Sequence, residues 1–138
     1  MRLRKDNKRE LIKSIPIFSH CSRKELDALS KEFDEIDVPA GRVLTTQGEP
    51  GREFVVVVQG TAEVTKDGRR VNMLAAGDFL GEIALLSGGP RTATVTTTSD
   101  ADLLILNSRS FARLTKDVPS LQTSVLRALS DRLAADAL

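Results

Sequence analysis

The stretch that decides the fold is GDFLGEIALLSGGPRTATV, residues 77–95, because it interrupts a series of short strand patterns. Its first half has Gly81 and Glu82 followed by four apolar residues, which predicts one helical turn with free N–H groups at its start. Its second half turns at residues 88–90 and brings Arg91 to the start of a β-branched strand, where a planar guanidinium can bind phosphate oxygens. The stretch therefore predicts an anion-binding loop.

The same stretch offers further groups to a ligand. The carboxylate of Glu82 can accept hydrogen bonds from hydroxyl groups, and Thr92 adds a hydroxyl of its own. With the helical turn and Arg91, these groups suit a ligand that carries a compact phosphate beside a ribose. The stretch holds no nucleophile paired with a base and no pair of carboxylates flanking a bond. This pattern indicates binding, not catalysis.

Around this stretch the sequence has the pattern of a mainly β protein. All nine glycines lie between Gly41 and Gly89, and glycine reaches the positive φ values that tight turns require. Seven or eight short strands with frequent turns predict an antiparallel sandwich or barrel. The expected strands begin at Glu35 and continue through residues 42–46, 53–59, 61–66, 69–74, 92–98 and 101–107.

Both flanks of this zone are expected to be helical. Ser22 and Glu25 form a capping box ahead of a helix over residues 23–32, and a shorter helix precedes it and ends near Ile15, before Pro16. On the other side, Ser108 can cap a short helix. A longer helix follows over residues 119–136. Its apolar stripe, which either the chain's own barrel or a second copy of the chain could cover, comprises Leu121, Val125, Leu129 and Leu133, widened by Leu126.

Composition excludes several classes of function. The chain has 138 residues, a formal net charge of +1, one His and one Cys, so a zinc ribbon, a disulfide framework and a multi-histidine metal site are excluded by count. We expect no metal, no cofactor and no catalytic residue, and an enzyme of the cupin type is disfavoured because such sites use several histidines. No membrane span and no export signal are apparent, so we expect a cytoplasmic protein.

A known family matches the central motif. Residues 81–86, a short loop and residues 90–95 together resemble the phosphate-binding cassette of cyclic nucleotide-binding domains, the sensor modules of catabolite activators and protein kinase A regulatory subunits. The resemblance covers about residues 10–136. It extends to a pattern of spaced residues in the strands: Gly48, Gly51, Phe54, Gly60 and Val64.

The resemblance implies a fold and a site. The fold would be a jelly roll (a double-stranded β-helix) with N-terminal helices and a C-terminal lid helix that covers the base. In the family, the residue at the position of Glu82 binds the ribose 2′-hydroxyl and the residue at the position of Arg91 pairs with the cyclic phosphate. Backbone N–H groups would complete the cradle, near Gly81, Ile83, Ala84, Thr92 and Ala93.

The expected ligand is cAMP, with cGMP as the alternative. Thr92 is the position that bears on this choice, because a Thr there can contact guanine in some members of the family while other Thr-containing members prefer cAMP. We expect a single domain over residues 1–138, divided into a helical lead (1–34), a barrel (35–107) that holds the cassette (81–95), and C-terminal helices (108–138).

The expected function is a stand-alone cyclic nucleotide receptor that changes the surface of its C-terminal helix when the ligand binds. A protein partner of unknown identity would read that surface, and the receptor would be a monomer or a homodimer through the same helix. Nucleic acid and membrane are not expected partners of this chain alone. Two alternatives stay open: a scaffold or interaction domain of the same fold that no longer binds nucleotide, and the sensor fragment of a larger transcription regulator.

Overall fold

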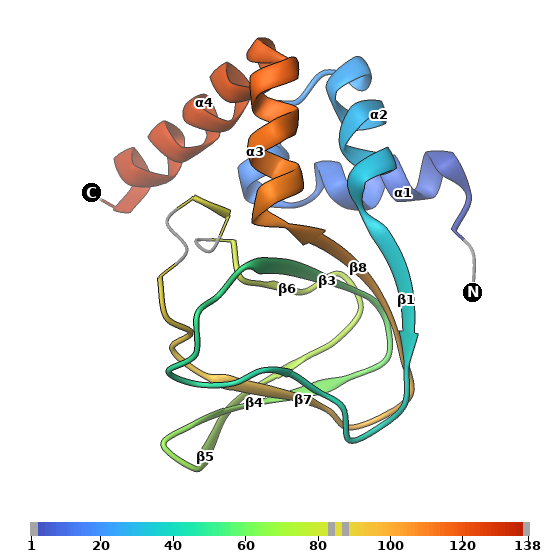
Figure 1. Cartoon of the computed structure of the whole chain (residues 1–138), viewed down its shortest axis with the longest axis vertical. Coiled ribbons are helices and arrows are strands. Elements are labelled where there is room, and N and C mark those ends of the chain that lie inside the picture. Colours follow the sequence, from blue (N-terminus) through green and yellow to red (C-terminus); the bar gives the residue numbers. More distant parts are fainter. Residues whose placement is uncertain (1–2, 83–84, 87–88, 137–138) are drawn as a thin grey trace. The chain divides into compact units, whose positions relative to one another are not determined.

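The computed structural model describes residues 3–82, 85–86 and 89–136. Two compact units are present: a β unit over Phe33–Arg109, and a helical unit formed by the residues up to Glu32 and from Ser110 onward. In chain order the described elements are α1 (Lys5–Lys13), η1 (Pro16–Phe18), α2 (Arg23–Glu32), β1 (Asp34–Val38), β2 (Val43–Thr45), β3 (Glu53–Gln59), β4 (Ala62–Lys66), β5 (Arg69–Leu74), β6 (Phe79–Leu80), β7 (Thr94–Thr97), β8 (Ala101–Asn107), α3 (Ser108–Asp117) and α4 (Pro119–Asp136) (Figure 1).

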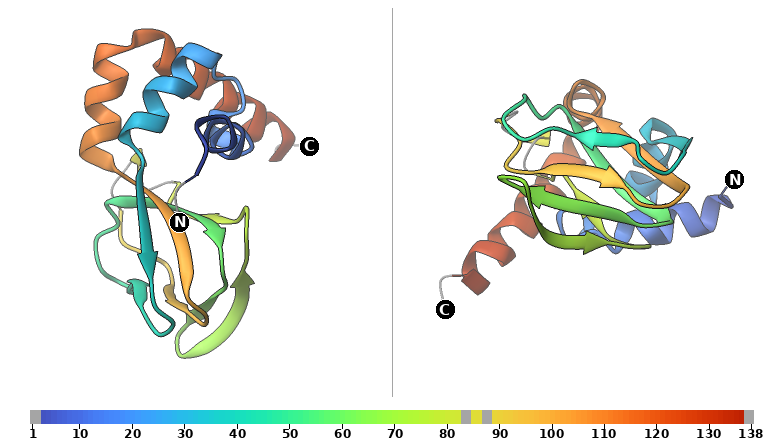
Figure 2. Two further views of the ribbon diagram at one scale, coloured as in Figure 1. Left: turned by 90° about the vertical axis from the view of Figure 1, so that its right-hand side faces the viewer. Right: turned by 90° about the horizontal axis from the view of Figure 1, so that it is seen from below.

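The β unit consists of two antiparallel sheets that face each other (Figure 2). One sheet has the strand order β1-β8-β3-β6 and the other the order β2-β7-β4-β5. Consecutive strands along the chain thus often lie in different sheets, as in a jelly roll. The predicted mainly β fold with flanking helices, an antiparallel jelly-roll barrel, is confirmed.

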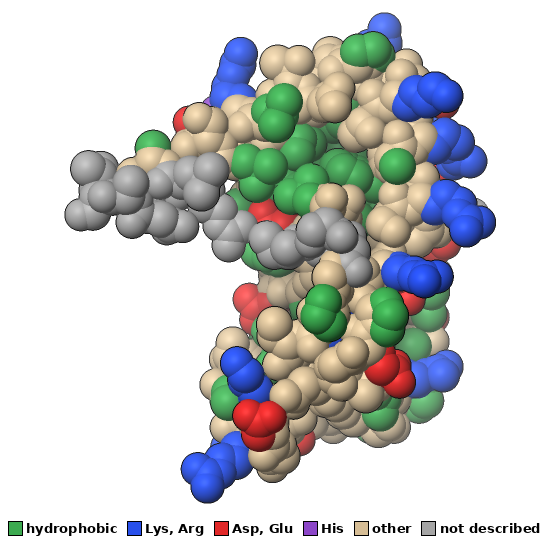
Figure 3. Space-filling view, turned by 60° about the vertical axis from the view of Figure 1, so that its left-hand side comes forward, with side chains coloured by type: hydrophobic (Ala, Val, Ile, Leu, Met, Phe, Trp, Pro, Cys, Tyr) green, Lys and Arg blue, Asp and Glu red, His purple; other side chains and the backbone are tan. Residues whose placement is uncertain are grey.

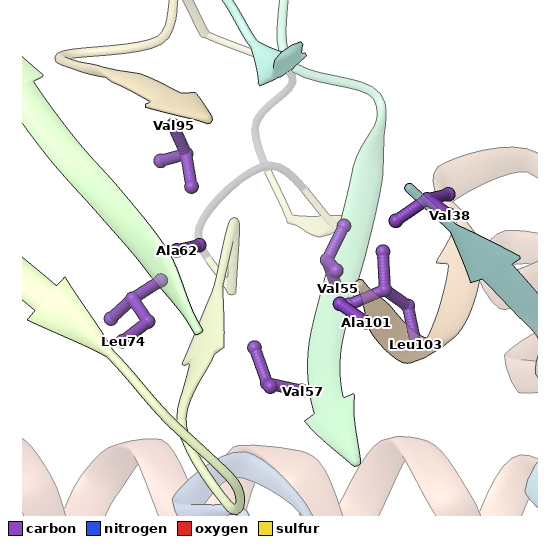
Figure 4. Packing of buried hydrophobic residues seen from close by; sticks show 8 residues of the cluster. All are labelled: Val38, Val55, Val57, Ala62, Leu74, Val95, Ala101 and Leu103. Atoms are coloured by element: carbon purple, nitrogen blue, oxygen red, sulfur yellow. The ribbon is translucent and has the colours of Figure 1, made fainter. Parts of the chain in front are cut away.

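Aliphatic side chains from both sheets fill the space between them. On β3, Val55 and Val57 point into this core and meet Leu103 of β8, while Val95 of β7 and Leu74 of β5 come from the opposite sheet (Figure 4). Alternate residues of a strand point to opposite faces, so each strand contributes every second side chain to the core.

Strand β3 is buried on both faces, which explains its continuous apolar run. The residues between the core-facing valines, Phe54 and Val56, are also fully buried. The ring of Phe54 packs edge-on against Phe33, with 6.2 Å between the centroids, and in a tilted arrangement against Phe79, with 5.8 Å between the centroids. A strand buried on both faces has no reason to alternate apolar with polar residues.

The helical unit is organised around a capping box and a buried apolar face. The backbone N–H of Ser22 donates to Glu25 Oε1 at 2.7 Å, and the backbone N–H of Glu25 donates to Ser22 Oγ at 3.2 Å. This confirms the predicted start of α2. In the predicted apolar stripe of α4, Leu121 and Val125 are buried, Leu129 is half-buried, and the side chain of Leu133 lies outside the described residues; Ala128 is buried as well.

Two features of the structure differ from the sequence expectations. Leu126 does not widen the buried face of α4, because its side chain is 60% exposed. The short strand β6 was not predicted, since it is defined by its pairing with Val55 and Val56 of β3 and not by a pattern of its own. The 3-10 helix η1 follows the predicted break at Pro16.

Within the part of the chain that the structure describes, no helix combines the length and the apolar character that crossing a membrane requires. The expected cytoplasmic location stays a prediction.

Candidate functional site

The backbone of Arg91 is fixed by the turn between β2 and β3. Its N–H donates to the carbonyl of Glu49 and its own carbonyl accepts from the N–H of Gly48, each at 2.8 Å. Just before it, Pro90 forms an antiparallel bridge with Pro50. Strand β7 begins only at Thr94, so the expectation that Arg91 opens that strand is wrong. The turn at residues 48–51 holds it instead.

The side chain of Arg91 lies against two glycines. A Cβ atom added to Gly51 would lie 2.6 Å from Arg91 Nε, and one added to Gly81 would overlap with the guanidinium. The guanidinium also donates a hydrogen bond to the backbone carbonyl of Glu53. Glycines at these two positions therefore leave room for the arginine side chain to lie along the backbone.

The electrostatic environment of Arg91 favours an anionic ligand. Burial lowers the pKa of its guanidinium, and the nearby charge of Glu53 partly offsets this shift. The guanidinium remains a cation at neutral pH, because an arginine side chain keeps its proton far above neutrality. The bond to the Glu53 carbonyl uses one of five N–H donors. A partly desolvated cation attracts an anion more strongly than one in bulk water.

Attraction of an anion by this protein has to be local. On the face of the β unit shown in Figure 3, Lys and Arg side chains are interspersed with Asp and Glu side chains. The chain as a whole carries 20 basic and 19 acidic residues. A field that draws anions to a whole surface needs a larger imbalance, so an anion would have to be bound by local groups such as the guanidinium of Arg91.

Glu82 is the second predicted site residue, and its side chain is buried, with 6% exposed. It follows Gly81, which has a φ of +85° and borders the guanidinium of Arg91. The N–H of Leu85 donates to the carbonyl of Glu82 at 3.3 Å. The structure thus brings Gly81 beside Arg91, whereas the predicted helical turn includes residues 83–84, which lie outside the described residues.

The remaining predicted residues divide into two groups. Thr92 is exposed, and Ala93 is half-buried with its carbonyl accepting a hydrogen bond from Thr45 Oγ1 at 3.2 Å. Ile83 and Ala84 lie outside the described residues. The ligand-binding roles predicted for all seven residues remain predictions.

Two hollows elsewhere are less suited to an anion. One, of about 690 Å³, lies at the end of the β unit where Asp37, Asp100 and Asp102 gather. A hydrogen bond between the carboxyl groups of Asp37 and Asp102 raises the pKa of Asp102 and lowers the pKa of Asp37. The other, of about 650 Å³, lies in the helical unit, where Arg9 is already paired with Asp6 and Asp27. A smaller pocket of about 320 Å³ borders Arg91.

Sequence reasoning missed Gly51 and Glu53 as neighbours of Arg91. Gly51 was noted only as part of the pattern of spaced residues that resembles the family, because nothing local shows that it meets a residue about forty positions away. Among the described residues, no group of three or more His, Cys, Asp and Glu could hold a metal ion.

A known protein family matches the central part of this chain. The family model of the cyclic nucleotide-binding domain matches residues 35–117, and the chain belongs to this family. The resemblance noted in the sequence is thereby confirmed. The matched range contains both Glu82 and Arg91.

Named relatives include regulatory proteins. The cAMP-dependent protein kinase regulatory subunit of Mycosarcoma maydis is 37% identical over 114 residues, which cover 76% of this chain and 22% of that protein. The N-terminal domain of a transcriptional regulator from Streptomyces coelicolor A3(2) superposes with a TM-score of 0.84 at 27% identity, covering 91% of this chain and 94% of that one.

A third relative was solved with its ligand. The regulatory domain of Toxoplasma gondii PKA, crystallised with cAMP, superposes with a TM-score of 0.74 at 31% identity, covering 82% of this chain and 45% of that one. Three curated relatives extend well beyond the match, because the chain spans 22%, 34% and 58% of their lengths.

Proposed function

We propose that this chain is a cyclic nucleotide receptor module that binds cAMP, with cGMP as the weaker ligand. In this proposal Arg91 pairs with the cyclic phosphate, Glu82 accepts a hydrogen bond from the ribose 2′-hydroxyl, and the backbone around Gly81 and Ala93 supplies further donors. The observation that carries the proposal is the partly desolvated guanidinium of Arg91, bordered by Gly81, the residue before the buried Glu82.

The chemistry of the ligand fits these groups. A cyclic nucleotide has a single negative charge on its phosphate and a free 2′-hydroxyl on its ribose. One guanidinium matches that single charge, and a bidentate arrangement on two phosphate oxygens would add geometric specificity. AMP carries a bulkier and more highly charged phosphate, which one cation in a confined space accommodates less well.

In this proposal the module signals through a change in the surface of α4 when the nucleotide binds. A protein partner would recognise that surface. Two polar contacts inside the helical unit hold this helix: Ser124 Oγ donates to Glu25 Oε1 at 2.9 Å, and His20 Nε2 lies 2.5 Å from Asp131 Oδ2. A nucleotide that prefers one arrangement of α4 over another would shift the population between them. The free thiol of Cys21 is compatible with a cytoplasmic location for such a receptor.

Thermal unfolding of the full chain with cAMP, cGMP and AMP tests this proposal. A ligand that binds only the folded state stabilises it by mass action and so raises Tm. At a hundredfold excess over Kd, the free energy of unfolding increases by about 2.7 kcal/mol. We expect cAMP to raise Tm most, cGMP less and AMP least. A Tm that does not change with millimolar cAMP or cGMP would leave a scaffold of the same fold as the function.

A further inference from the structure

The contact between Arg91 and the turn before β3 has a feature that the family's ligand contacts do not explain. Gly51 is buried, yet its φ does not lie in the left-handed region, so its backbone conformation is open to any residue. The usual reason for a glycine, a positive φ, is therefore missing here. We therefore looked for a steric reason why position 51 holds a glycine.

The neighbours of Gly51 supply that reason. The three atoms nearest to a Cβ at this position all belong to the Arg91 side chain: Nε at 2.6 Å, Cδ at 2.9 Å and Cζ at 3.0 Å. A methyl group at Gly51 would thus clash with the Arg91 side chain in its present position. No other group lies as close to it as these three atoms. The N–H of Gly51 also donates to the carbonyl of Gly89 at 3.1 Å, so the backbone is held close to the arginine.

Gly81 differs from Gly51 in two respects. Its φ is +85°, and a Cβ there would overlap both with the guanidinium and with the backbone carbonyl of Glu53. An alanine at position 81 would therefore be strained even if the arginine side chain were removed. The two glycines border the same side chain for different physical reasons.

We propose that Gly51 is a positioning residue for Arg91: together with Gly81 and the Glu53 carbonyl it forms a slot that holds the guanidinium in one orientation. We call these three groups the arginine slot. An arginine that is already oriented loses less conformational entropy when an anion binds. The consequence for nucleotide affinity rests on the proposed function, whereas the steric part of the inference does not.

The arginine slot predicts that the effect of Gly51→Ala on Tm changes sign when the Arg91 side chain is removed, which a double-mutant cycle measures. Gly51→Ala in the wild-type chain forces the flexible end of the Arg91 side chain to move and breaks its bond to the Glu53 carbonyl, so we expect Tm to fall by about 2 to 5 °C. In an Arg91→Ala background the same methyl group meets no such obstacle. There we expect Gly51→Ala to leave Tm unchanged or to raise it, because replacing glycine at a compatible φ reduces the entropy of the unfolded chain.

Gly81→Ala is the matched control. We expect it to lower Tm in both backgrounds, since the Glu53 carbonyl and the positive φ oppose it with or without the arginine. A fall in Tm caused by Gly51→Ala that is equally large in both backgrounds would overturn the slot, because the methyl group would then be meeting something other than Arg91.

The second measurement is the affinity for cAMP, followed by displacement of a fluorescent cyclic nucleotide at a temperature where all variants are folded. We expect Gly51→Ala to weaken binding about tenfold or more, the effect of one lost charge-assisted hydrogen bond. An unchanged affinity would overturn the positioning role. If the wild-type chain binds no cyclic nucleotide while the Tm cycle still changes sign, the slot stands and the proposed function fails.

Discussion

Two charged side chains, the half-buried Arg91 in the β unit and the buried Glu25 in the helical unit, are satisfied in different ways. The carboxylate of Glu25 accepts hydrogen bonds from the Ser22 backbone and from the Ser124 hydroxyl, all within the protein. The guanidinium of Arg91 is held by steric contact with glycines and donates to one backbone carbonyl. A charge with several internal hydrogen-bond partners stabilises a fold, whereas we expect a charge held mainly by contact with glycines to keep N–H donors for a ligand.

The largest expected effect comes from removing the cation. Arg91→Ala would leave a bound phosphate without its ion-pair partner, and we expect binding of cAMP to weaken by about 2 to 5 kcal/mol, about 30-fold or more. Displacement of a fluorescent cyclic nucleotide measures this, since the chain has no Trp. Arg52→Ala, at an exposed arginine of the same turn, is the matched control and should change affinity much less. Equal losses in the two variants would contradict the special role of Arg91.

A smaller effect is expected from the predicted ribose contact. Glu82→Ala removes the acceptor for the 2′-hydroxyl, so it should weaken cAMP binding less than Arg91→Ala and should narrow the difference in affinity between cAMP and 2′-deoxy-cAMP. Competition between the two nucleotides on each variant measures the difference. If the preference for the ribonucleotide survived the substitution, the assignment of Glu82 would be wrong.

In the helical unit we expect an effect on stability. Ser124→Ala removes a hydrogen bond to the Glu25 carboxylate, and bonds to charged groups contribute about 1.5 to 3 kcal/mol. Urea unfolding of the full chain should show the loss. The control is Ser130→Ala, an exposed serine of the same helix, which should be nearly neutral or slightly stabilising. A neutral Ser124→Ala would show that Glu25 does not need this partner.

The pH dependence of stability should show how much the charge of Glu25 stabilises the helical unit. Burial tends to raise the pKa of Glu25, but hydrogen bonds from Ser22, Ser120 and Ser124 outweigh it and lower the pKa below its ordinary value of 4.5. The stabilisation is then complete above about pH 4.5 and is lost as the pH falls through the lowered value. Glu25→Gln should therefore lower Tm at neutral pH, and the difference from wild type should shrink in acid. A difference that stayed constant from pH 7 to pH 3 would contradict this.

The sequence predicted those features that short stretches specify. The capping box at Ser22 placed α2, and Pro119 with the spacing of the following leucines placed α4. Glu82 and Arg91 stood out because the cassette is a continuous motif. The arginine slot could not be predicted, because it forms only where the turn at Gly51, the end of β6 and Arg91 meet in space. Exposure of Leu126 likewise depends on which neighbours cover α4.

A crystal structure of the full chain with cAMP would test the central claim most directly. We predict that two guanidinium N–H groups of Arg91 lie about 2.7 to 2.9 Å from oxygens of the cyclic phosphate, while the side chain still borders Gly51 and Gly81 and donates to the Glu53 carbonyl. A nucleotide bound away from Arg91, or an arginine that has left the slot to reach the phosphate, would contradict the account.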